Sequence, residues 1–259
     1  MIICKSKPEL EIMQRANQVV AQILGELVER VKPGVTTGEL DEYAEARVRE
    51  LGGEPAFKGY RGFPASLCTS LNEEVVHGIP SRSRHIAPGD VVSMDLGVKL
   101  EGFFGDSATT VAVPPVDERV ERLLRATEGS LQKAIEQCRV GKRVGDISHA
   151  VQAHVEAAGF SVVREFVGHG IGAVLHEDLQ IPNFGRPGVG QRLRAGMVLA
   201  IEPMVNMGSH EVEVLEDGWT AVTKDRRPSA HFEHSVAITE EGPWVLGAPP
   251  RRMRKAASG

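Results

Sequence analysis

The chain has 259 residues, of which 41% are hydrophobic and 5% aromatic, and it carries a formal net charge of -5. This length allows one large domain or two small ones, and the acidic balance argues against nucleic-acid binding by the body of the protein. Cys4, Cys68 and Cys138 have no paired spacing, which argues against a disulfide framework and for a reducing compartment. The sequence has no signal-peptide pattern and no apolar run of about 18 residues, so we expect a cytoplasmic protein without a membrane partner.

Two helices are predicted at the start of the chain. The first covers residues 6–31, where Ser6 and Glu9 form a capping-box pattern and apolar residues recur along one face. A Lys-Pro-Gly turn at residues 32–34 ends this helix. The second helix is predicted from residue 36 or 37 to residue 51, before a pair of glycines.

An antiparallel hairpin is predicted next, and it carries two acidic residues. Its strand-like runs are Val91–Val98 and Phe103–Val113. If the two-residue loop is 100–101, Asp95 lies directly opposite Asp106, and if it is 101–102, the two lie diagonally. Both registers place the two acids on one face, with Cβ atoms about 5 Å or about 7 Å apart.

The pattern of the first half recurs in the second half. After a shift of 107 positions (34 to 141), the helix and turn positions Gly34, Gly38, Leu40, Ala44, Val48 and Gly52 fall on Gly141, Gly145, Ile147, Val151, Val155 and Gly159. The same shift carries Asp95 onto Glu202, and the segment around Asp106 resembles the segment around Glu233. Amphipathic helices share a period, so coincidence is the alternative explanation. We predict a single α+β catalytic domain over residues 1–259, with an internal repeat at about 10–113 and 117–240 and a basic tail at 247–259.

Five residues form a candidate ligand set for a pair of metal ions: Asp95, Asp106, His169, Glu202 and Glu233. They lie in stretches that read as buried, and burying a carboxylate costs on the order of several kcal/mol unless positive charge compensates it. Four carboxylates and one imidazole suit two divalent ions of manganese, iron, cobalt or zinc. A mononuclear iron oxygenase would instead require two histidines and one carboxylate.

Six motifs carry a resemblance to a known family. They are Asn72-Glu73-Glu74-Val75-Val76-His77-Gly78-Ile79-Pro80, Asp95-Leu96-Gly97 with Gly105-Asp106, Gly168-His169-Gly170-Ile171-Gly172, His176-Glu177, Ile201-Glu202-Pro203-Met204 and Phe232-Glu233-His234. From about Leu10 to Leu246 the chain resembles the type I methionine aminopeptidases. The resemblance implies an α+β pita-bread fold, in which two halves of paired helices and antiparallel strands surround a central curved antiparallel sheet with helices on its outer face. The 31 positions that separate Glu202 from Glu233 (233 minus 202) favour type I over type II, and the absence of a zinc-finger extension favours a bacterial or organellar style.

The resemblance also implies roles for individual residues. The five candidate ligands match the dinuclear metal site of the family, where an activated water attacks the first peptide carbonyl and Glu202 transfers the proton. His176 matches the histidine that stabilises the oxyanion and His77 the one that contacts the scissile amide nitrogen, so both are catalytic and substrate-binding candidates.

The methionine pocket and a cation site are implied in the same way. The pocket walls are Tyr60, Phe63, Cys68 and Trp219, with Phe57 and Leu175 in neighbouring positions. Phe63 and Leu175 replace a tyrosine and a phenylalanine that the family often has, and His231 replaces a common glutamine. Asn72, Glu74 and Ser229 resemble a site for one monovalent cation, Na or K.

The predicted function is therefore removal of the N-terminal methionine from nascent proteins and peptides with a small second residue. We further expect a monomer that can associate transiently with ribosomes, although the sequence itself determines neither property. Two alternatives share the fold. An Xaa-Pro aminopeptidase or prolidase usually carries a long N-terminal domain, and a non-catalytic pita-bread binding protein should have lost metal ligands.

Overall fold

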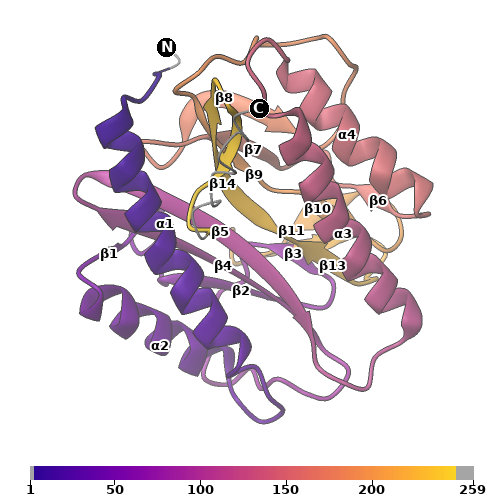
Figure 1. The fold of residues 1–259 in the computed structure, drawn as a ribbon. Coiled ribbons are helices and arrows are strands. Elements are labelled where there is room, and N and C mark those ends of the chain that lie inside the picture. The colour runs from indigo at the N-terminus through magenta and orange to yellow at the C-terminus, as the bar shows by residue number, and fades with distance from the viewer. Residues whose placement is uncertain (1–2, 249–259) are drawn as a thin grey trace, which may run out of the picture.

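The structure is a computed structural model that describes residues 3–248, so the basic residues from 249 onward in the expected tail lie outside the described residues. Figure 1 shows two helix pairs flanking the strands of an antiparallel sheet. The helices are α1 (Lys7–Val28), α2 (Thr37–Glu50), α3 (Glu118–Gln137) and α4 (Val144–Ala157). None of the helices in this part of the chain is long and apolar enough to cross a membrane.

The largest sheet runs in the order β1-β4-β5-β14-β9-β7-β8, with β2 also on β4 and β15 on β14. Its strands are β1 (Glu54–Pro55), β2 (Leu67–Leu71), β4 (Val91–Leu100), β5 (Phe103–Ala112), β7 (Val167–Gly170), β8 (Glu177–Pro182), β9 (Val198–Ile201), β14 (Glu233–Thr239) and β15 (Gly242–Val245). All of these pairs are antiparallel.

Two small sheets complete the strands. One joins β13 (Ser229–His231), β10 (Met204–Asn206) and β6 (Ser161–Val162), and the other joins β11 (Val212–Val214), β12 (Ala221–Thr223) and β3 (Glu74–Val76). A single turn of 3-10 helix, η1, covers Tyr60–Gly62.

The helix starts follow from local sequence. Ser6 with Glu9 and Thr36 with Glu39 form capping boxes at α1 and α2, which satisfy backbone N–H groups that have no partner within the helix. These starts confirm the predictions. The end of α1 differs, because the helix stops at Val28 rather than at residue 31. The Leu27 carbonyl there accepts hydrogen bonds from the backbone N–H groups of residues 30 and 31, at 2.9 Å and 3.1 Å, which tightens the last turn.

The β4–β5 hairpin selects one of the two predicted registers. Leu100 pairs with Phe103, so the loop is 101–102, and its residues have φ values of 49° and 86°. Positive φ at both positions is the geometry of a type I′ turn, which matches the twist of the strands. Asp95 pairs with Ala108, and Asp106 lies diagonally across the ladder on the same face.

Each helix pair packs against its own part of the sheet (Figure 1). Fully buried apolar residues of α1, α2, β2 and β4 form one core cluster, and those of α3, α4, β9 and β14 form another. Two strands of each half, β4 with β5 and β14 with β9, lie side by side at the middle of the sheet. The internal repeat and the single-domain assignment stay predictions.

Candidate metal centre

One cavity of about 150 Å³ gathers all five candidate ligands. Asp95 comes from β4, Asp106 from β5, His169 from β7 and Glu233 from the first position of β14, whereas Glu202 directly follows β9. The cavity is lined by Phe57, Tyr60, Arg61, Phe63, Cys68, His77, Asp95, Asp106, His169, His176, Glu202, Trp219 and Glu233. Strands that are far apart in sequence therefore bring the five side chains to one place.

The donor atoms lie close enough to share a cation. Three ligand atoms, one each from Asp106, His169 and Glu233, lie within 4.8 Å of one another. His169 Nε2 is 3.9 Å from Asp106 Oδ2 and 3.6 Å from Glu202 Oε1. Asp106, His169 and Glu233 are all buried, and Asp106 and Glu233 are only 3% and 2% exposed. These donors are mostly oxygen, as hard divalent cations prefer.

The protein leaves the negative charge of this cluster uncompensated. Burial raises the pKa of Asp95 to about 7 and raises the pKa of Glu202 and Glu233 well above the usual range. Asp95 Oδ1, Asp106 Oδ1 and Glu233 Oε1 are buried and have no hydrogen-bond partner. Within the described residues, the ion-pair contacts of these four acids involve histidines and no lysine or arginine. Buried carboxylate oxygens without hydrogen-bond partners fit divalent metal ions.

The orientation of His169 suits a metal ligand. Its Nδ1 lies 2.9 Å from the carbonyl oxygen of Gly170, so Nδ1 carries the proton and donates it. Nε2 then presents a lone pair toward the carboxylates. Burial lowers the pKa of His169 to about 4, which keeps the imidazole neutral and able to coordinate.

Two further histidines border the same cavity. His176 stacks on Tyr60, with its Nδ1 2.9 Å from the tyrosine hydroxyl, and its ring centroid is 4.1 Å from that of His169. When the hydroxyl donates to Nδ1, Nε2 carries the proton and can donate to a substrate oxygen. Burial, followed by the charge of neighbouring groups, lowers the pKa of His176. His77 lies after β3 with φ 61°, and its ring contacts Phe166 and Trp219 edge-on.

The apolar side of the cavity contains most of the predicted pocket walls. Phe63 contacts Trp219 edge-on at 5.2 Å between centroids. Cys68 pairs with Asp95 across β2 and β4, and burial raises the pKa of its thiol, so it stays protonated. Leu175 is fully buried in the same apolar cluster but does not line the cavity.

Sequence reasoning missed one cavity residue, Arg61. It lies in η1 with φ 50°, and its guanidinium is 5.4 Å from the Tyr60 ring centroid. Glycines at 59 and 62, both with positive φ, lie on either side of it and allow the chain to turn tightly here. The Gly-Tyr-Arg-Gly spacing was the available signal.

His231 also belongs to this region. Its Nε2 is buried without a hydrogen-bond partner and lies 3.9 Å from Glu202 Oε2. Burial lowers the pKa of His231 to about 3, so the ring is neutral. The hydroxyl of Thr110 holds its backbone at both N and O, which fixes the position of the ring beside Glu202.

The three residues predicted to bind a monovalent cation are partly connected. The backbone N of Ser229 donates to the carbonyl of Asn72 at 2.8 Å. The Asn72 side chain donates to Asp90 and accepts from the backbone of Val91, and Glu74 accepts from the backbone of residue 71. The Ser229 hydroxyl donates to the carbonyl of Val205 at 3.1 Å. The three side chains are therefore engaged with the protein, which favours backbone carbonyl oxygens as ligands for a cation.

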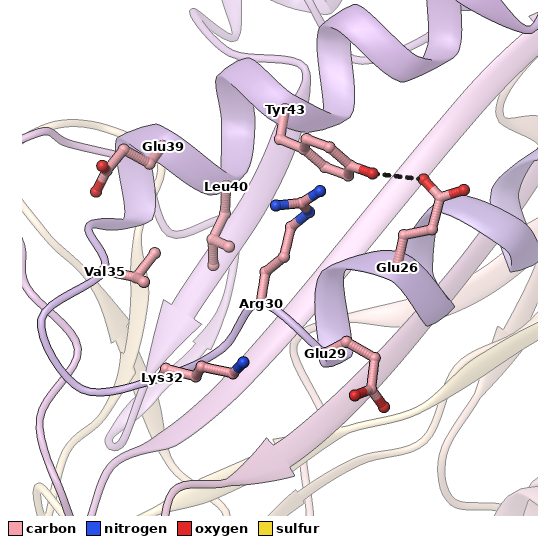
Figure 2. Close-up of a pocket in the computed structure, with 8 residues that line it drawn as sticks. All are labelled: Glu26, Glu29, Arg30, Lys32, Val35, Glu39, Leu40 and Tyr43. Carbon is pink, nitrogen blue, oxygen red and sulfur yellow. Dashed lines mark hydrogen bonds between the residues drawn. The ribbon is translucent and has the colours of Figure 1, made fainter.

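A larger hollow, of about 660 Å³, lies between the end of α1 and the start of α2, away from the carboxylates. Figure 2 shows Tyr43 donating to Glu26 beside the Arg30 guanidinium, which lies 3.7 Å from the tyrosine ring centroid. Glu26 also forms an ion pair with Arg47 at 2.8 Å. The described lining contains no histidine or cysteine, so this hollow offers no comparable chemistry.

Comparisons with known proteins agree with this geometry. The model of metallopeptidase family M24 matches residues 11–240. A methionine aminopeptidase of Clostridium perfringens is 53% identical over 95% of this chain and 98% of its own length, and methionine aminopeptidase 1 of Bacillus subtilis is 53% identical over 95% and 99%. The crystal structure of methionine aminopeptidase from Thermotoga maritima has a TM-score of 0.95 at 47% identity, covering 96% of this chain and 100% of that one.

The prolidase alternative shares the fold at a greater distance. Prolidase from Pyrococcus furiosus has a TM-score of 0.78 at 22% identity, and the match covers 66% of that chain. A likeness at this identity shows the fold alone.

Proposed function

This chain belongs to metallopeptidase family M24 and, within it, to the bacterial type I methionine aminopeptidases, and from this premise we propose that it removes the N-terminal methionine from peptides and nascent proteins. Its α+β architecture is the pita-bread fold. The convergence of the five candidate metal-ligand side chains in one cavity is the observation that supports the reaction most directly.

Two divalent metal ions would be held by Asp95, Asp106, His169, Glu202 and Glu233. When bound, such a pair lowers the pKa of a water molecule and polarises a carbonyl, which makes hydrolysis possible at neutral pH. Manganese, iron, cobalt and zinc all accept this ligand set, so we propose that the two ions are drawn from these four metals.

Protein side chains would carry out the remaining steps. The Glu202 carboxylate accepts the proton of the attacking water and passes it to the leaving amine, which its place beside the cavity allows. His176 donates from Nε2 to the oxygen of the tetrahedral intermediate, because Tyr60 orients the opposite ring nitrogen. His77 hydrogen-bonds the scissile amide nitrogen.

Substrate selection would depend on the apolar side of the cavity. Phe57, Tyr60, Phe63, Cys68 and Trp219 surround a small volume that suits an unbranched thioether, and polarisable methionine fills such irregular space well. Leu175 supports this wall from behind. The limited room favours peptides with a small second residue.

The finer features follow from the family relationship. We propose a single catalytic domain with an internal repeat, active in the cytoplasm as a monomer, with transient ribosome association. A monovalent cation, Na or K, would bind near Asn72, Glu74 and Ser229 through backbone oxygens.

Peptide hydrolysis after chelation tests the proposal. The protein is stripped of metal, and manganese, cobalt, iron or zinc is added back singly with Met-Ala-Ser or an Xaa-Pro peptide as substrate. We expect cleavage of Met-Ala-Ser only, and only with metal. Cleavage of Xaa-Pro peptides alone would favour the prolidase alternative, and activity after complete chelation would contradict the metal-dependent mechanism. No cleavage with any metal would favour a non-catalytic binding protein.

A further inference from the structure

The N-terminal arm of the chain contributes one buried lysine to the region around the cavity. Lys5 Nζ lies 2.8 Å and 2.7 Å from the two carboxylate oxygens of Glu177 and 3.2 Å from the carbonyl of Ile3. The two side chains of this ion pair are only 2% and 9% exposed. Among the described residues, other lysine and arginine ion pairs are more exposed, such as Arg47–Glu26 at 19% and 27%.

The acidic partner lies next to a site residue. Glu177 directly follows His176 and is the first residue of β8, whereas His169 lies in β7 at the other end of the connecting loop. A Cβ atom on Gly172 would be 2.4 Å from both Glu177 Oε1 and Lys5 Cε. The ion pair therefore fills the space directly under this loop.

The backbone of Lys5 is fixed from the opposite direction. Its N–H donates to the carbonyl of Gly196 at 2.7 Å. Gly196 has φ +87°, and a Cβ there would be 2.8 Å from the Lys5 carbonyl oxygen. Gly196 lies at the turn before β9, the strand that leads to Glu202. The turn at Gly196 thus fixes the position of Lys5, and the ammonium group of Lys5 fixes the position of the Glu177 carboxylate.

We propose that Lys5 is a positioning residue for the peptidase reaction, holding Glu177 so that His176 stays in line with Tyr60 and His169 at the cavity. This inference rests on the proposed function. Neither Lys5 nor Glu177 lines the cavity, so both act through the loop rather than on the substrate.

The charge of Lys5 matters for geometry more than for net stability. A buried ion pair contributes little net stability, because desolvation offsets the attraction between the charges. Loss of one partner is different, since the remaining charge is enclosed without compensation. Without the ammonium group, Glu177 gains by turning toward water, and the peptide bond it shares with His176 moves that ring away from the Tyr60 hydroxyl.

Two variants interrupt the contact from its two sides, Lys5→Met and Glu177→Gln. With a methionyl peptide and saturating metal, we expect kcat to fall by about 10- to 100-fold in each, while KM changes by less than about 3-fold. The Lys5→Met/Glu177→Gln double variant should lose little more than either single variant, because both remove the same contact. Bound metal per protein should stay unchanged.

A second measurement is independent of turnover. The NMR resonances of the His176 ring and hydrogen exchange of the amides at 170–177 should change in Lys5→Met and Glu177→Gln. The matched control is Arg47→Met, which breaks the Arg47–Glu26 ion pair between α1 and α2. It should lower the melting temperature without changing kcat or these resonances.

The outcomes separate the two proposals. A wild-type protein that cleaves no methionyl peptide with any metal contradicts the proposed function, and the ring resonances still test the positioning role. Wild-type activity together with unchanged kcat in both variants overturns the role of Lys5. If Arg47→Met loses kcat to the same extent as the two variants, the loss reflects general stability, and the role of Lys5 is also overturned. If Lys5→Met does not fold, Glu177→Gln alone decides between these results.

Discussion

Replacing Asp95 with asparagine should change protein stability in opposite directions with and without metal. Asparagine has nearly the same shape but no charge. Burial raises the pKa of Asp95 from its ordinary value of 3.8 to about 7. In the metal-free protein the wild type must therefore bury a carboxylate that resists ionisation, and Asp95→Asn removes that cost.

The magnitude follows from linkage between proton binding and folding. Below pH 3.8 Asp95 is protonated in both states and contributes no difference. As pH rises toward about 7, the unfolded state releases the proton while the folded state keeps it, so wild-type stability falls by about 1.4 kcal/mol per pH unit. The loss is about 2 kcal/mol at pH 5 and reaches about 4 kcal/mol above pH 7. Asp95→Asn should be more stable by amounts of this order.

Urea unfolding at pH 5 and pH 8 measures the effect. In the presence of chelator, Asp95→Asn should stabilise the protein more at pH 8 than at pH 5. The effect is the unfolding free energy of the variant minus that of the wild type, so the titration of the histidines, which both proteins share, cancels. With saturating manganese the variant should be the less stable protein, because one anionic ligand is missing and metal bound to the folded state stabilises less. A metal-free variant that is destabilised at pH 8, or equally stabilised at both pH values, would refute the reasoning.

Three further predictions concern other parts of the site. Asp106→Asn should reduce metal-dependent peptide cleavage by more than about 100-fold and weaken metal binding in calorimetric titration; unaffected binding would count against Asp106 as a ligand. Tyr60→Phe should lower kcat about 5-fold in steady-state assays, since one hydrogen bond of about 1 kcal/mol to His176 is lost; an unchanged kcat would remove Tyr60 from the orienting role. Gly172→Ala should lower the free energy of unfolding by about 1–3 kcal/mol, because its methyl group collides with the Lys5–Glu177 pair; urea denaturation with the wild-type midpoint would contradict this.

Local features of the fold were predictable because nearby residues cause them. The capping box of Ser6 with Glu9 formed as predicted, and the second helix begins within the predicted positions, where Thr36 forms a further capping box with Glu39. The hairpin could be predicted only to within two registers, although both kept Asp95 and Asp106 on one face. Its type I′ turn then selected the diagonal pairing.

The chemical identity of the site was also present in the sequence. Four acids and one histidine in stretches that read as buried indicated an oxygen-rich metal site, and their motifs indicated the family. Alternation within a strand predicts which side chains share a face, but not which strand meets which.

Only the tertiary structure decided the contacts that surround these residues. Tyr60 orients His176 across 116 positions, and Lys5 meets Glu177 across 172. Such pairs leave no local pattern, because chain reversal and sheet order bring them together. The sequence by itself determined the helices, the hairpin and the ligand types. Packing between distant strands determined the cavity, the burial that raises the carboxylate pKa values, and the support behind His176.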